Sequence, residues 1–295
     1  MPQKFLPSPS KKVFIMENIT PKKLFPNIGD VLVMPVLFLI MQLVVGVVLG
    51  IFGLVPPTLT EGVDPEVYMA EQEQLGRYSA LVYPLLMVFS IVAIWFYARM
   101  RGGKGAVSIR RSIAGFNPSV ILIGVIWLLS SQIILEPLME LMPESESPSV
   151  GRGVWAWVTV VAFAPVMEEL LCRGLILGIS RKRWGVKTSI LISALFFGAI
   201  HLDVSTIIVA FVAGLILGVI YVRTSSIFST MIIHAINNVL AFTMVCLGFE
   251  NTSFRELLGG GVAYYLIYGL AVLIFIAVSV EGYFKVLRRK KVKQE

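Results

Sequence analysis

Charged residues, cysteine and histidine are all scarce in this chain of 295 residues. Asp, Glu, Lys and Arg make up 15% of it, whereas an ordinary soluble domain carries about 25%. The two cysteines both fall in apolar segments, so the sequence indicates neither a disulfide framework nor a thiolate metal cluster. The N-terminal segment has no short apolar core followed by small residues, which argues against a removable signal peptide.

Apolar sequence is abundant instead, since hydrophobic residues form 57% of the chain. The formal net charge is +7, but the positive residues recur at the ends of apolar stretches and do not gather in one patch. This distribution is typical of membrane topology signals and does not favour a nucleic-acid partner. We therefore predict an all-α, polytopic protein that is integrated in a lipid bilayer.

Eight apolar stretches, bounded by charge, proline or glycine, are candidates for membrane-spanning helices. The fifth is the weakest, because it is shorter than the roughly 20 residues that a spanning helix normally needs. We expect one transmembrane domain over residues 30–284, between a basic segment 1–29 and a basic tail 285–295. The predicted spans are 31–55, 79–98, 118–135, 153–180, 188–202, 204–222, 226–248 and 259–283.

The positive charges also predict an orientation. Lys and Arg are frequent before the first span and after the second, fourth and eighth, and Arg223 follows the sixth. The alternate connections hold only Arg77, Arg152 and Arg255. Because cytoplasmic connections carry the excess of Lys and Arg, both termini are predicted to be cytoplasmic. The expected location is the cell membrane of a prokaryotic host or the endoplasmic reticulum membrane of a eukaryotic one.

Several polar side chains lie inside these apolar spans. Ionisable groups are costly in hydrocarbon, so we expect them to face one another around a buried polar site. At about 1.5 Å per residue from the cytoplasmic ends, four of them reach depths of about 12 to 20 Å and share one layer of the membrane. These four are Glu168, His201, His234 and Asn238.

Spacing within the helices suggests how these groups pair. Glu169 and Arg173 are four residues apart and can form an ion pair on one helix face. That pairing would leave Glu168 as the freer acid and a candidate general base. His234 and Asn238 are also four apart, and an imidazole and a carboxamide can both donate hydrogen bonds to a developing oxyanion.

Three motifs, in order, carry a family resemblance. The run Glu168-Glu169-x-x-x-Arg173, then Phe197-x-x-x-His201, then His234-x-x-x-Asn238 resembles the signature of the CAAX-protease and bacteriocin-processing family of integral membrane proteins. That family includes the type II CAAX prenyl endopeptidase. The resemblance covers roughly residues 150–245 of this chain.

The resemblance implies an intramembrane endopeptidase. Glu168 and His201 would activate a water for attack on a peptide carbonyl, and His234 and Asn238 would stabilise the oxyanion. Glu169 and Arg173 would support these four residues. The implied substrate is a membrane-associated peptide or protein of the CAAX type that is cut near its C-terminus. The resemblance does not decide whether that C-terminus carries a lipid.

A zinc site is the alternative to a reaction without cofactors. Glu168, His201 and His234 would satisfy a site with two histidines and one carboxylate. We favour the version without metal, because no His-Glu-x-x-His helix is present and because ligation would occupy the best candidate base.

Two other classes of function use the same residues. A non-catalytic membrane protein, acting in peptide immunity or as a scaffold, would bind a peptide end without hydrolysing it. A proton-coupled transporter would use the Glu and His residues as a relay. The transporter ranks last, because the halves show no recognisable inverted repeat.

Overall fold

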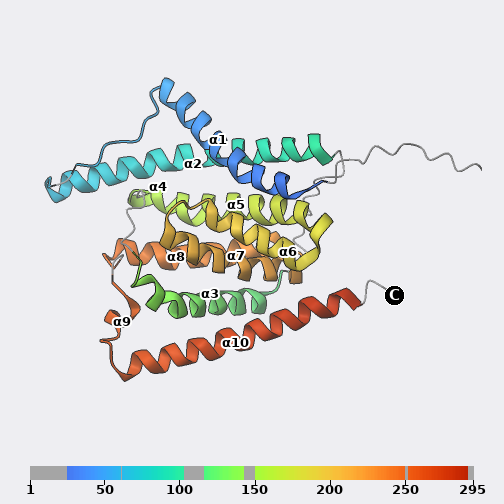
Figure 1. Cartoon of the computed structure of the whole chain (residues 1–295). Coiled ribbons are helices and arrows are strands. Elements are labelled where there is room, and N and C mark those ends of the chain that lie inside the picture. Colours follow the sequence, from blue (N-terminus) through green and yellow to red (C-terminus); the bar gives the residue numbers. More distant parts are fainter. Residues whose placement is uncertain (1–24, 61, 103–115, 143–149, 250–251, 292–295) are drawn as a thin grey trace, which may run out of the picture.

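The described part of the chain folds into a bundle of helices (Figure 1). The computed structural model describes residues 25–60, 62–102, 116–142, 150–249 and 252–291, and all regular elements in these ranges are helical. The α-helices are α1 (Ile28–Ile51), α2 (Pro65–Gly102), α3 (Pro118–Met139), α4 (Gly153–Val158), α5 (Ala164–Glu169), α6 (Leu177–Ala199), α7 (Val204–Thr224), α8 (Ile227–Cys246), α9 (Phe254–Leu257) and α10 (Val262–Lys291). Two π-helical segments, η1 (Thr159–Phe163) and η2 (Leu170–Ile176), lie on either side of α5.

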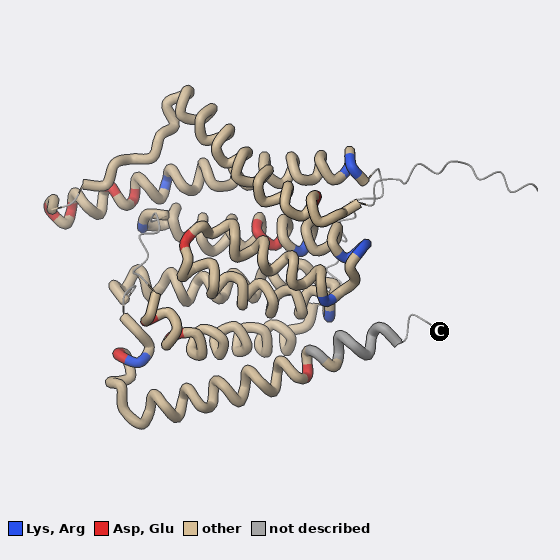
Figure 2. Tube along the Cα trace, in the orientation of Figure 1, with Lys and Arg blue, Asp and Glu red and all other residues tan. Residues whose placement is uncertain are grey.

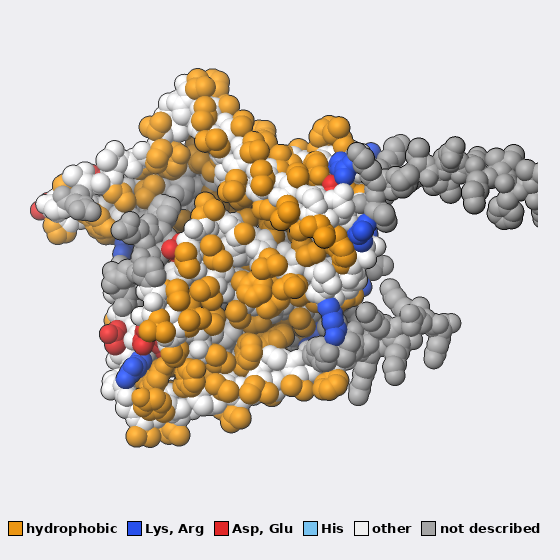
Figure 3. Space-filling view, viewed as in Figure 1, with side chains coloured by type: hydrophobic (Ala, Val, Ile, Leu, Met, Phe, Trp, Pro, Cys, Tyr) orange, Lys and Arg blue, Asp and Glu red, His pale blue; other side chains and the backbone are white. Residues whose placement is uncertain are grey.

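The helices have the length and hydropathy of membrane spans. Six are long and apolar enough to cross a bilayer, namely α1, α2, α3, α7, α8 and residues 262–282 of α10. Hydrophobic side chains cover most of the face seen in Figure 3, and the described Lys and Arg residues lie mostly at the two ends of the bundle (Figure 2). The prediction of an all-α, integral, multi-pass membrane protein is confirmed.

All eight predicted spans are helical, and the fourth and fifth differ most from expectation. The fourth runs without a break through α4, η1, α5, η2 and the start of α6. Gly185, with a φ of 74°, then turns the chain inside α6. This left-handed conformation is one that glycine adopts without a steric penalty. The fifth span is the second half of α6, and it ends at Ala199, earlier than predicted.

Helix α2 begins well before the predicted span 79–98. It starts at Pro65, with Glu66 in its first turn, and both residue types favour a helix N-terminus. Its 38 residues give a length of about 57 Å, nearly twice the roughly 30 Å of a hydrocarbon core. We therefore expect the acidic first part of α2 to extend beyond the membrane, where charge is readily solvated.

The positions of the first and last helices agree with an even number of membrane crossings. The start of α1 and the end of α10 lie at the same end of the bundle (Figure 1). The assignment of that end to the cytoplasm stays a prediction from the distribution of Lys and Arg. The segment 1–29 lies mostly outside the described residues, as does the end of the basic tail.

Small residues bring α7 close to α6. A Cβ atom added to Gly214 would lie 2.9 Å from Ala194 Cα and 3.1 Å from Ala194 Cβ. Gly214 also accepts a hydrogen bond at its carbonyl oxygen from Arg173 Nη2, at 3.1 Å. The close approach of the two helices therefore places a backbone acceptor beside a buried guanidinium.

We expect Gly214→Ala to destabilise the protein by about 1 to 3 kcal/mol, because the added methyl group overpacks a helix contact. The measurement is thermal unfolding of the purified protein in detergent. Gly178→Ala is the matched control, since a Cβ atom there meets nothing within 4 Å and alanine favours helix formation. Equal unfolding temperatures for the two variants would contradict the close packing at Gly214.

Candidate active site

An ion pair stands at the centre of the polar cluster. Glu169 and Arg173 are both fully buried, and Arg173 Nη1 donates to Glu169 Oε1 at 2.6 Å. The guanidinium carbon lies 4.7 Å from the centre of the Phe197 ring, within the range of a cation–π contact. The pairing expected from the spacing is present, and it is held from both α7 and α6.

His234, on α8, lies between the two glutamates. Its Nδ1 is 3.3 Å from Glu169 Oε1, although the two atoms do not form a well-aligned hydrogen bond. Its Nε2 is 3.8 Å from Glu168 Oε2, which is too long for a direct hydrogen bond. One imidazole thus faces a carboxylate on either side in the interior of the bundle.

Glu168 has a hydrogen-bond partner that its position in the sequence did not suggest. Its side chain is buried, and its Oε1 accepts a hydrogen bond from the hydroxyl of Tyr83 at 2.7 Å. Tyr83 belongs to α2, which packs against α4, η1 and α5. The two oxygens of Glu168 therefore have different neighbours, a phenol at Oε1 and an imidazole at Oε2.

His201 lies in a turn and not inside a helix as expected. Helix α6 ends at Ala199, and the turn to α7 includes Leu202, whose φ of 63° is unusual for a bulky residue. His201 Nδ1 is 2.7 Å from the carbonyl oxygen of Phe197. Because a carbonyl oxygen can only accept, Nδ1 carries the hydrogen, and the neutral ring keeps its lone pair on Nε2.

Phe197 connects the two histidines. Its ring centroid is 5.2 Å from that of His201 and 5.5 Å from that of His234, and both contacts are edge-to-face. The Phe197 side chain is buried. The Phe197 ring therefore contacts both imidazoles, one from the turn after α6 and one from α8.

Asn238, one turn after His234 on α8, is bonded to the irregular helix. Its Nδ2 donates to the carbonyl oxygen of Val160 in η1 at 2.9 Å. Pro165 cannot donate a backbone hydrogen bond, and the chain before it is π-helical. Asn237 accepts from Gln132 of α3 at 2.7 Å and lies 3.5 Å from Asn238 Oδ1. A carboxamide has a second N–H, so Asn238 keeps one donor beyond this bond.

The structure brings together most of the residues proposed from sequence. Glu168, Glu169, Arg173 and His234 are in one contact network, and His201 reaches it through Phe197. Asn238 is held by η1, and no contact with either glutamate is seen in the described residues. Their catalytic roles stay predictions.

Sequence reasoning missed Tyr83 and Gln132. Both are hydrogen-bonding side chains inside predicted or observed spans, which is a usable signal. No spacing rule connects residue 83 with residue 168, because the helices that carry them meet only in the folded bundle. The carbonyl oxygen of Val160, which accepts from Asn238, is a backbone atom, so the types of the side chains give no sign of it.

The candidate ligands of the alternative zinc site are not gathered in one place in the described residues. Within the described ranges, no three His, Cys, Asp or Glu side chains are grouped closely enough to hold a metal ion. Glu168, His201 and His234 are therefore not arranged as a ligand shell in this structure. The expectation of a reaction without metal stays a prediction.

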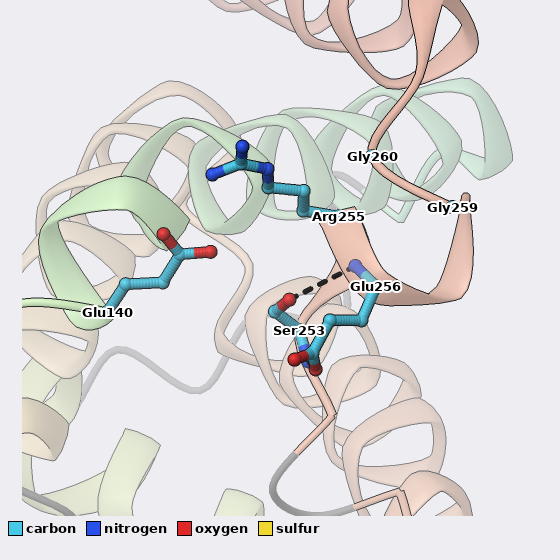
Figure 4. A pocket seen from close by; sticks show the side chains of 6 residues that line it. All are labelled: Glu140, Ser253, Arg255, Glu256, Gly259 and Gly260. Carbon is cyan, nitrogen blue, oxygen red and sulfur yellow. Dashed lines mark hydrogen bonds between the residues drawn. The ribbon is translucent and has the colours of Figure 1, made fainter.

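A cavity of about 500 Å³ lies elsewhere in the molecule. Figure 4 shows it beside α9 and the end of α3, and none of its lining residues belongs to the polar cluster. Ser253 caps α9 there by accepting a hydrogen bond from the backbone N–H of Glu256 at 3.1 Å. The Ser253 hydroxyl is used in this cap, and the cavity contains none of the residues proposed from sequence, so the buried cluster remains the candidate site.

The apolar helices and the buried ionisable cluster define an integral, multi-pass membrane protein with a polar site inside its helical bundle. A family model described as Rce1-like, type II CAAX prenyl endopeptidase, matches residues 150–240. The matched range contains all six site residues proposed from sequence, and it confirms the resemblance. The match supports a protease, and hence a hydrolase. No curated protein and no solved structure matches the chain.

Proposed function

We propose that this protein is a glutamate-dependent intramembrane endopeptidase. It hydrolyses a peptide bond near the C-terminus of a membrane-associated substrate of the CAAX type. The observation that carries the proposal is the position of Glu168, with one oxygen 3.8 Å from His234 Nε2 and the other bonded to Tyr83, inside the segment that matches the endopeptidase family.

Glu168 and His201 are proposed to activate the attacking water. The distance between Glu168 Oε2 and His234 Nε2 is too long for a direct bond and short enough for one water to contact both groups. The Nε2 lone pair of His201 is a second acceptor. The water gives up a proton to these bases, and its oxygen forms a bond to the scissile carbonyl carbon.

The oxyanion is proposed to be held by His234 and Asn238. The carbonyl electron pair moves onto oxygen, and N–H donors from these two side chains stabilise the charge. Collapse of the tetrahedral intermediate breaks the C–N bond, and the proton taken from water goes to the leaving amine. The products are a carboxylic acid and an amine, and transfer of the acid's proton to the amine leaves a carboxylate and an ammonium group, so atoms and charge balance.

The test is cleavage of defined peptides by the purified protein in proteoliposomes. A farnesylated peptide ending in a CAAX sequence and its unprenylated counterpart are incubated with the protein, and the products are identified by mass spectrometry. We expect a shortened peptide and a released C-terminal fragment. Binding of the peptide without any product would favour the non-catalytic peptide-binding alternative.

We expect cleavage to continue after exhaustive chelation, since the proposed steps use only side chains and water. The rate is measured before and after chelation, and the metal content is determined on the same sample. Stoichiometric zinc whose removal abolishes cleavage would overturn the version without metal. Restoration by zinc alone, and not by magnesium, would identify the ion.

A further inference from the structure

Tyr83 contributes to the site from outside the segment that matches the family model. It lies on α2, whereas the match begins at residue 150. Its hydroxyl donates to Glu168 Oε1 at 2.7 Å, across 85 positions of sequence. The donor is partly buried and the acceptor is buried. A hydrogen bond to a carboxylate in such surroundings is stronger than one between neutral groups.

We propose that Tyr83 is a positioning residue, one that fixes the carboxylate of Glu168 so that Oε2 is the oxygen available for proton transfer. This inference rests on the proposed function. Oε1 already accepts a hydrogen bond, while Oε2 faces His234 Nε2. A carboxylate held at one oxygen cannot rotate freely about its terminal torsion. The reacting oxygen therefore stays at a fixed place relative to His234.

The geometry explains why a phenol is suited to this task. Tyr83 precedes Pro84 within α2, and Glu168 projects from α5, which contains Pro165 in its first turn. A rigid ring with few torsions spans the gap between the two helices at little entropic cost. A misplacement of about 1 Å in a reacting group can reduce a rate by about a hundredfold. Loss of the hydroxyl should therefore affect turnover more than substrate binding.

The same helix offers a matched control. Tyr97, about four turns further along α2, donates from its hydroxyl to Asp30 Oδ1, also at 2.7 Å. Both tyrosines are partly buried, and both bonds join α2 to a carboxylate on another helix. Asp30 belongs to α1 and has no described contact with the polar cluster. Phenylalanine at either position removes one bond of the same kind.

The experiment compares Tyr83→Phe with Tyr97→Phe in the proteoliposome cleavage assay. We expect Tyr83→Phe to lower kcat by about ten- to a hundredfold with KM nearly unchanged. We expect Tyr97→Phe to cleave at close to the wild-type rate. Unfolding temperatures in detergent should be similar for the two variants. A general structural defect would lower both unfolding temperature and folded yield, and a substrate contact would raise KM.

A double-mutant cycle with Glu168→Asp tests whether Tyr83 acts through Glu168. Aspartate is shorter by one methylene, so the hydroxyl no longer reaches its carboxylate in the same way. If Tyr83 positions Glu168, Tyr83→Phe adds little to the loss caused by Glu168→Asp, because interacting residues are not additive. Full additivity, or equal kcat for the two tyrosine variants, would overturn the positioning role.

The assay distinguishes failure of the proposed protease function from failure of the inference about Tyr83. A wild-type protein that cleaves neither peptide would overturn the proposed protease, and the positioning role of Tyr83 in that reaction falls with it. Cleavage by the wild type that is lost in Glu168→Gln but unchanged in Tyr83→Phe would overturn only the inference about Tyr83.

Discussion

Glu168→Gln is expected to reduce peptide cleavage by about 10² to 10⁴-fold, the usual contribution of a general base. The carboxamide keeps an oxygen that can accept from Tyr83, so the local hydrogen bond is retained while the basic oxygen is lost. The measurement is kcat/KM for the farnesylated peptide, together with the unfolding temperature. The unfolding temperature should stay close to that of the wild type.

Two further variants sharpen this prediction. Glu73→Gln changes an exposed glutamate on α2, so it should cleave normally and exclude a general effect of removing negative charge. Asn238→Ala should keep about a hundredth of the activity or less, as expected when one oxyanion donor is removed. Near-normal turnover by Glu168→Gln would show that another group serves as the base, and the proposed mechanism would be wrong.

Arg173→Met is expected to destabilise the fold by about 3 to 5 kcal/mol, because it leaves a buried carboxylate without its partner. The change also removes the hydrogen bond to the Gly214 carbonyl and the contact with the Phe197 ring. Thermal unfolding in detergent, with folded yield from size-exclusion chromatography, measures the effect. Loss of cleavage should accompany the loss of folded protein.

An exposed pair with the same spacing is the control for Arg173. Arg77 Nη2 lies 2.8 Å from Glu73 Oε1, and both side chains are more than half exposed. Arg77→Met should therefore change stability by only about 0 to 1 kcal/mol. The double variant Glu169→Gln/Arg173→Met should be more stable than Arg173→Met alone, because its buried charge is gone. A double variant that is as unstable as Arg173→Met would contradict the uncompensated-charge explanation.

The local pattern was enough to place the helices and the ion pair. Each predicted span is helical because apolar side chains in a bilayer leave the backbone only its own groups to bond with. The Glu169–Arg173 pair follows from two charges one turn apart on one helix. The family match over residues 150–240 agrees with the motifs that suggested it.

The positions of His201 and Asn238 needed the fold. His201 was expected at the end of a helix, but α6 stops at Ala199 and places it in a turn against Phe197. Asn238 was expected to face the glutamates, but its amide bonds to a carbonyl in the π-helical segment. Helix periodicity gives directions around one axis, and it does not report where a helix ends or becomes π-helical.

The sequence by itself determined that this is a helical membrane protein and which ionisable residues lie within its spans. The membrane class follows from the apolar composition of each segment. The ionisable residues within the spans stand out because charge is costly in hydrocarbon and is therefore rare there. Only the tertiary structure decided that Tyr83 reaches Glu168 and that His234 lies between two carboxylates. Contacts between helices depend on how their surfaces pack, and residues far apart in the chain carry no spacing that reveals them.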